Sequence, residues 1–199
     1  MYETVLKGGY AMIPLLFCSL LSLAVIIEKG FALRSRAVLP PRLLLALRDD
    51  PRRTADLIER DRSPLAGILR SFFLDRKLSR RQAADNLRLA LRRQADGLER
   101  GLVLLEIVAV ISPLLGLLGT VLGMVEVFKV ISQLGVGQAQ AMSGGIAQAL
   151  ITTIAGLIVA IPALAAHSLY SRKVDRLLLN LEEAAEACLP ISPDEEGQS

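Results

Sequence analysis

Three long stretches without a charged residue limit what this chain can fold into. Residues 8–27 contain 20 uncharged residues, residues 107–125 contain 19, and 42 more separate Lys129 from Arg172. A helix needs about 20 apolar residues to cross the hydrocarbon core of a bilayer. The first two stretches fit one span each, and in the third the Gln-, Ser- and Gly-containing part before residue 146 reads as a loop. We therefore predict an all-α membrane protein with three transmembrane helices.

The composition supports a membrane protein and argues against an enzyme. Apolar residues make up 52% of the 199 residues, yet the chain has no Trp and only 5 Phe and 3 Tyr. Cys18 and Cys188 lie near opposite ends of the chain, so they suggest neither a metal site nor a disulfide framework. The sequence shows no nucleophile–base pair, metal-ligand cluster or phosphate-binding loop, and we predict no catalysis, cofactor or metal.

The distribution of basic residues predicts the orientation in the membrane. Residues 29–100 hold 18 of the 23 Lys and Arg residues, whereas the stretch between the second and third spans holds only Lys129. Cytoplasmic segments next to membrane spans are enriched in Lys and Arg. We therefore expect the amino terminus in the periplasm and the carboxyl terminus in the cytoplasm. The basic segment fits attraction to anionic lipids better than nucleic-acid binding.

The predicted order of segments follows from these two patterns. It comprises a periplasmic amino terminus (1–9), a first span (10–28), a cytoplasmic helical segment (29–105), a second span (106–130), a periplasmic loop (131–145), a third span (146–170), and a cytoplasmic helix with a disordered tail (171–199).

Apolar periodicity in the cytoplasmic segment continues into the second span. Small and apolar residues recur every three or four positions from Ala84 to Leu105, and no Pro intervenes before Pro113. We expect one unbroken helix over about 80–130, and a similar extension of the third span beyond Arg172. Before these helices, Ser63-Pro64 reads as a helix start, with a capping residue followed by proline at the first helical position.

The second and third spans carry stripes of small residues at helical spacing, whereas the first span is bulky on most sides. Such stripes let membrane helices pack closely, and packing alone is the simplest interpretation. Thr120 and Thr153 add one hydroxyl to each stripe, which suggests a polar-lined interior. The packing positions are Gly116, Gly119, Gly123, Gly145, Ala149 and Gly156.

Prolines and a single acid complete the candidate features of the spans. Pro113 and Pro162 each free a backbone carbonyl one turn earlier, and the simplest interpretation is a packing kink. Glu106 is the only charged residue expected inside a span, near the cytoplasmic end of the second one. It either takes part in function or pairs at the interface. His167, the single histidine, is expected to be a hydrogen-bonded or solvated side chain.

Two motifs resemble the ExbB/TolQ/MotA proton-channel family, with ExbB and TolQ most similar. They are ISPLLGLLGTVLGM over residues 111–124 and GIAQALITTIAGLIVAIP over residues 145–162. The resemblance implies a five-membered ring around the helices of an ExbD- or TolR-like partner in the bacterial inner membrane. It also implies that proton-motive force drives envelope work through a TonB- or TolA-like protein.

The resemblance further assigns candidate residues for the proton pathway. The positions of Thr120 and Thr153 line the interior that faces the partner's membrane aspartate, and Thr152, Gln148 and Glu106 are further candidates. Many ExbB and TolQ chains have glutamate where this chain has Gln148, so the resemblance does not extend a proton or ion-pair role to that position. The spans carry no acid at mid-depth, and the chain is expected to line the pathway while the carrier comes from the partner. A structural membrane scaffold and a stand-alone ion-conducting protein remain as alternatives.

Overall fold

The computed structural model describes residues 11–34, 38–43, 45, 58–61, 63–73, 80–134 and 139–186. Its principal helices are α2 (Met12–Ala32), α6 (Pro64–Phe73), α7 (Arg80–Glu99), α8 (Leu102–Leu134) and α9 (Ala139–Glu186), and these described residues contain no strand. The periplasmic amino terminus expected at 1–9 and the tail expected at 187–199 lie outside the described residues.

Three helices are long and apolar enough to cross a membrane, which confirms the predicted all-α membrane fold. The candidate spans are Met12–Ala32, Leu102–Gln133 and Ser143–Glu186. Large apolar side chains project from these helices, and Phe17, Leu20 and Ile158 are each at least 65% exposed. Surfaces of this kind need lipid or another chain to cover them. The chain is therefore a multi-pass membrane protein.

The chain divides into two compact units. Met1–Glu28 and Gly101–Leu169 form the first, here called the membrane unit. Lys29–Arg100 and Tyr170–Ser199 form the second, here called the basic unit because it holds most of the Lys and Arg residues.

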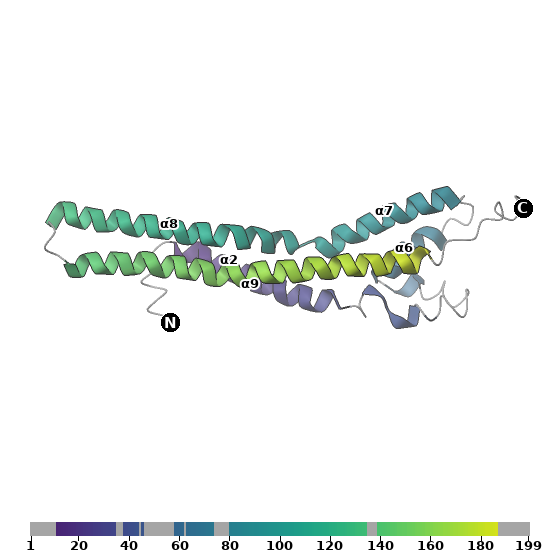
Figure 1. Cartoon of the computed structure of the whole chain (residues 1–199). Helices are drawn as coiled ribbons and strands as arrows, with labels where there is room; N and C mark the ends of the chain where they lie inside the picture. Colours follow the sequence, from purple (N-terminus) through teal and green to yellow (C-terminus); the bar gives the residue numbers. More distant parts are fainter. Residues whose placement is uncertain are drawn as a thin grey trace, which may run out of the picture. The chain divides into compact units, whose positions relative to one another are not determined.

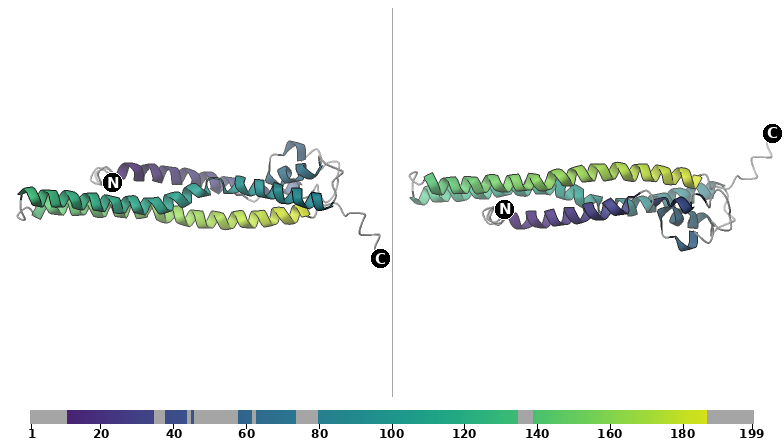
Figure 2. Two further views of the ribbon diagram at one scale, coloured as in Figure 1. Left: turned by 90° about the horizontal axis from the view of Figure 1, so that it is seen from above. Right: turned by 90° about the horizontal axis from the view of Figure 1, so that it is seen from below.

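Within the membrane unit, α8 and α9 run side by side in opposite directions, and α2 lies alongside them (Figures 1 and 2). The packing cluster at one level contains Val108 and Ala109 of α8 and Ala163 of α9. Cys18 and Leu21 of α2 pack against this cluster. Small residues at the centre allow three helices to meet closely where no hydrophobic force drives them together.

The connection between α8 and α9 is shorter than the sequence suggested. We expected a loop over 131–145, but α8 continues to Leu134 and α9 begins at Ala139. Gln and Ser are tolerated inside helices, so their polarity alone does not indicate a loop. Gly144 and Gly145 also lie inside α9, where Gly145 contacts Val127 of α8.

The expected unbroken helix over 80–130 is wrong at one point. α7 ends at Glu99 and α8 begins at Leu102, with Gly101 between them at φ 95°. Glycine adopts this left-handed conformation without steric cost and commonly terminates helices. The break frees carbonyl groups at the end of α7, and the ammonium of Lys29 donates a 3.0 Å hydrogen bond to the carbonyl of Leu98.

Lys29 should stabilise the fold through this capping bond. The residue is only 6% exposed, and its charge lies at the carbonyl end of α7, where a cation is favourable. Lys29→Met leaves a buried carbonyl without its charged donor, at a cost of about 1.5–3 kcal/mol. For a chain of this size we expect a melting midpoint lower by about 4–10 °C in circular dichroism of the detergent-solubilised protein. The exposed Lys129→Met is the control, and an equal shift there would contradict the assignment.

In the basic unit, α6 packs its apolar residues inward. Ser63 caps this helix by accepting a 3.3 Å hydrogen bond from the amide of Ala66, which confirms the predicted start at Ser63-Pro64. Leu65 and Leu69 are fully buried. The guanidinium of Arg70 donates hydrogen bonds to three carbonyls of the preceding segment, those of Ile58, Glu59 and Asp61.

Candidate functional site

The small-residue stripes predicted on α8 and α9 meet each other within a single chain. Gly116 lies against the backbone of Thr152 and Thr153, and Gly123 lies against Gly145 and Ala149. A Cβ atom added at Gly123 would lie 2.9 Å from the Cβ of Ala149. As the residue numbers of the contacting positions increase along α8, those of their partners on α9 decrease, so the two helices are antiparallel. We call this contact the α8–α9 seam.

The seam has almost no room for larger side chains. A Cβ on Gly156 would lie 2.6 Å from the carbonyl oxygen of Ser112, and one on Gly119 would clash with the side chain of Thr152. Real Cβ atoms do not approach neighbours this closely, so glycine is required at both positions. Gly116, Gly119, Gly123, Gly145, Ala149 and Gly156 are therefore contacts of this seam, and we assign them to packing inside one chain.

Three threonine hydroxyls donate hydrogen bonds to backbone carbonyls. Thr120 donates to Leu117 at 2.6 Å on its own helix, and Thr153 donates across the seam to Gly116 at 3.1 Å. Thr152 donates to Ala149 at 2.7 Å, one turn earlier on α9. Each hydroxyl has one proton, so it donates to another acceptor only when it turns away from its backbone carbonyl.

Thr120 and Thr153 lie on the same side of the helix pair. Each follows a seam residue by one position, Gly119 on α8 and Thr152 on α9. Each residue advances the chain by about 100° around its helix. Seen from one end of the pair, the chain turns clockwise along one helix and anticlockwise along its antiparallel neighbour. Equal offsets from the seam therefore place both threonines on one flank, and both are half-buried. We call this the threonine flank.

Gln148 lies away from the threonine flank. It precedes Thr153 by five residues, which is about 140° around α9. It precedes Val159 by eleven residues and so shares the side of α9 on which Val159 packs with Cys18 and Leu21 of α2. Gln148 is half-buried, and the structure does not bring it together with the two threonines.

Glu106 lies on the side of α8 that carries Thr120, but far from it along the helix. The separation of 14 residues corresponds to about 21 Å. Its side chain is exposed in the single chain. No other Asp, Glu, Lys or Arg lies between Leu102 and Val125 of α8 or between Ala139 and Ser171 of α9.

The assignment of Thr152 to the interior lining is corrected by the structure. Its side chain is fully buried in the α8–α9 seam against Gly119, so it cannot face an interior shared with another chain. Sequence reasoning could not separate Thr152 from Thr153, because adjacent hydroxyls give the same signal until the direction of the neighbouring helix is known.

Ser112 also lies in the α8–α9 seam, where its carbonyl oxygen faces Gly156. Its hydroxyl is fully buried without a hydrogen-bond partner in the described structure. The next residue, Pro113, lies inside α8, and Pro162 lies inside α9. Pro113 has no amide hydrogen to donate to the carbonyl of Ala109, so this carbonyl lacks its usual hydrogen bond within the helix.

In the part of the chain that the structure describes, no group of His, Cys, Asp and Glu could hold a metal ion.

Comparisons with known proteins identify the family of this chain. The family model described as the MotA/TolQ/ExbB proton channel family matches residues 60–183. The chain is 36% identical over 180 residues to the biopolymer transport protein exbB1 of Vibrio cholerae, covering 85% of this chain and 78% of that protein. A putative ExbB-like biopolymer transport protein of Synechocystis is 34% identical over 185 residues, covering 85% and 72%. The Tol-Pal system protein TolQ of Haemophilus influenzae is 38% identical over 91 residues, covering 46% and 40%. The chain therefore belongs to the MotA/TolQ/ExbB proton channel family.

Proposed function

We propose that this chain is the lining subunit of a motor in the bacterial inner membrane that uses proton-motive force. Five copies surround the membrane helices of a single-span partner like ExbD or TolR, which carries the membrane aspartate. The assembly drives envelope work through a TonB- or TolA-like protein. Membership of the proton channel family supports this function, as do relatives named for biopolymer transport and the Tol-Pal system.

The threonine flank is the structural observation that carries the proposal. Thr120 and Thr153 come from different helices, yet the antiparallel seam sets them on one side of the pair. Their hydroxyls give this flank polar groups within otherwise apolar spans. A partner carboxylate in a low-dielectric interior needs such groups when it releases its proton. We therefore place the threonine flank toward the partner helices.

The chain itself lacks a proton carrier in the middle of its spans. Moving one charge through 100 mV yields about 2.3 kcal/mol, and a titratable group at mid-depth is needed to use it. Glu106 lies at one end of its span, and α9 carries no acid before Asp175. This absence favours a chain that lines the pathway and a partner that supplies the carboxylate.

The proposed orientation places the basic unit in the cytoplasm. Lys29, Arg34, Arg100 and Arg172 lie near the ends of the spans on this side, and Lys129 lies at the opposite end of α8. Basic residues near span ends remain in the cytoplasm during insertion. The amino terminus and the α8–α9 connection then lie in the periplasm.

Cysteine labelling tests the orientation. In a background without Cys18 and Cys188, Gly137→Cys should react with a membrane-impermeant maleimide added to the periplasmic side, because it lies in the α8–α9 connection. Arg62→Cys should react only after the membrane is permeabilised. The reverse pattern would place the basic unit outside the cytoplasm and overturn the proposed pathway.

Proton flux into liposomes tests the function. Flux should be at background for this chain alone and should rise clearly when the partner is co-reconstituted, because the partner supplies the carboxylate. A partner variant with Asn in place of the membrane aspartate is the matched control and should return the flux to background. Robust flux from this chain alone would reject the lining role and favour a stand-alone ion-conducting protein with Glu106 as its acid.

A further inference from the structure

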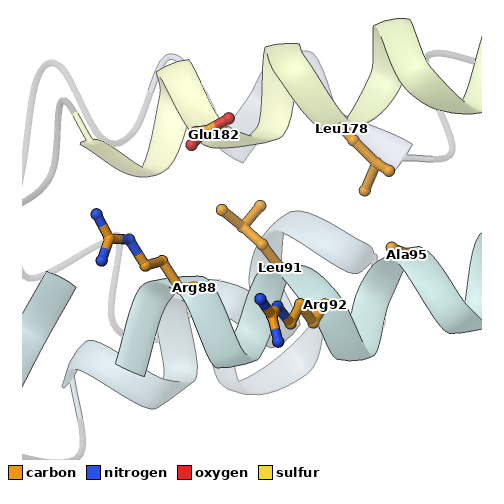
Figure 3. A pocket seen from close by; sticks show the side chains of 6 residues that line it. All are labelled: Arg88, Leu91, Arg92, Ala95, Leu178 and Glu182. Atoms are coloured by element: carbon orange, nitrogen blue, oxygen red, sulfur yellow. The ribbon is translucent and has the colours of Figure 1, made fainter. Parts of the chain in front are cut away.

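The basic unit contains an open groove between α7 and α9 (Figure 3). Its volume is about 280 Å³. Leu91 of α7 and Leu178 of α9 both point into the space between the two helices. The complete lining consists of Arg88, Leu91, Arg92, Ala95, Leu178 and Glu182.

The groove combines an apolar floor with positive charge at its edge. Arg88 and Arg92 lie one turn apart on α7 and are both exposed. Arg88 approaches Asp85 at 3.8 Å, but both side chains are more than 70% exposed. Such a surface pair contributes little, so the guanidinium remains available to another acid. Glu182 is the one acidic residue of the lining, on the opposite helix.

We propose that the chain's own segment 187–199 occupies this groove. The segment follows Glu186, one turn after Glu182, and reads ACLPISPDEEGQS. It contains three consecutive acids, Asp194, Glu195 and Glu196, and no Lys or Arg. Leu189 and Ile191 precede the acids. This order of apolar and then acidic residues is complementary to a groove with a leucine floor and an arginine edge.

The distances allow the segment to return to the groove. Asp194 follows the end of α9 by eight residues, which span up to about 26 Å when extended. Leu178 lies eight residues before that end, or about 12 Å along the helix. Because the segment is attached, its effective concentration at the groove is in the millimolar range, and weak contacts suffice. The bound segment would link α7 to α9 within the basic unit. This link does not require that the chain takes part in ion conduction.

Disulfide trapping in the full-length protein tests the proposal. In a background lacking Cys18 and Cys188, Ser192→Cys is combined with Ala95→Cys in the groove or with Gly97→Cys as control. Gly97 has no heavy atom within 4 Å of an added Cβ and lies about 200° around α7 from Ala95. Mild oxidation should give an internal disulfide several-fold more often with Ala95→Cys than with Gly97→Cys.

Charge reversal shows whether the acids direct the docking. Changing Asp194, Glu195 and Glu196 to Lys should lower the Ala95→Cys yield several-fold, and adding Arg88→Glu and Arg92→Glu should restore it. Equal yields at positions 95 and 97 would overturn the proposal, as would insensitivity to charge reversal. Disulfide-linked dimers in place of the internal disulfide would assign the groove to a neighbouring copy and also overturn it.

Discussion

Gly156→Leu should separate α8 from α9 and prevent assembly of the proposed ring. A Cβ at this position would lie 2.6 Å from the carbonyl oxygen of Ser112 and 3.2 Å from the Cα of Gly116. Both neighbours are backbone atoms of a helix, so they cannot rotate away as a side chain would. Overpacking a well-packed core costs about 1–3 kcal/mol even when side chains adjust. Here the helices themselves must move apart, and we expect a larger loss.

Gly144→Leu is the matched control for this change. Gly144 lies on the same helix, but an added Cβ meets nothing within 4 Å. Both variants lose one glycine of α9 and gain the same side chain, so only the seam contact differs. Native mass spectrometry should show the intact oligomer for Gly144→Leu and little or none for Gly156→Leu. An intact oligomer for both variants would show that Gly156 does not lie in a close contact between α8 and α9.

A disulfide across the seam shows directly whether α8 and α9 of one chain pair. A Cβ on Gly145 would lie 3.8 Å from the Cβ of Val127, within the range of natural disulfides. Val127→Cys with Gly145→Cys, in a background without Cys18 and Cys188, should therefore form an internal disulfide. Adding Gly156→Leu should lower its yield strongly, and adding Gly144→Leu should not. Bonds between two chains would contradict a seam inside one chain.

The fold could be predicted from the sequence because the main physical constraint, burial of uncharged helices in the bilayer, depends on the types of individual residues. Charged residues mark the ends of membrane spans, and stripes of small residues mark close helix contacts. The break at Gly101 was missed because a glycine inside an apolar pattern is tolerated in helices. What ends α7 there is the left-handed conformation of Gly101, and Lys29, 69 residues away from Leu98, binds the freed carbonyl.

The candidate site was predictable in kind but not in every residue. The stripes indicated that Gly116 and Gly156 pack closely, but they did not say whether the partner helix belongs to the same chain. The structure places that helix in the same chain and buries Thr152, leaving Thr153 on the flank. The direction of a side chain relative to a neighbouring helix depends on tertiary packing, which helical periodicity alone does not contain.

Replacing Thr120 and Thr153 together by Val should leave the fold nearly intact. Their hydroxyls donate to the carbonyls of Leu117 and Gly116, and such bonds in membrane proteins contribute about 0.6 kcal/mol on average. The loss of roughly 1 kcal/mol is small beside that expected for Gly156→Leu. Circular dichroism and the size of the oligomer should therefore stay close to those of the unaltered protein.

Proton flux with the partner should nevertheless fall at least about tenfold in this double variant. Each hydroxyl can turn from its backbone carbonyl to donate its single proton to an ionised partner carboxylate. Hydrogen bonds to charged groups contribute about 1.5–3 kcal/mol, and in the double variant the carboxylate would lose both of these donors in a low-dielectric interior. Thr152→Val is the decisive control, because it removes a hydroxyl from the adjacent residue that is buried in the seam. It should keep most of the flux. If Thr152→Val reduced flux as strongly as the double change, the hydroxyls would act through packing, and the threonine flank would not face the partner.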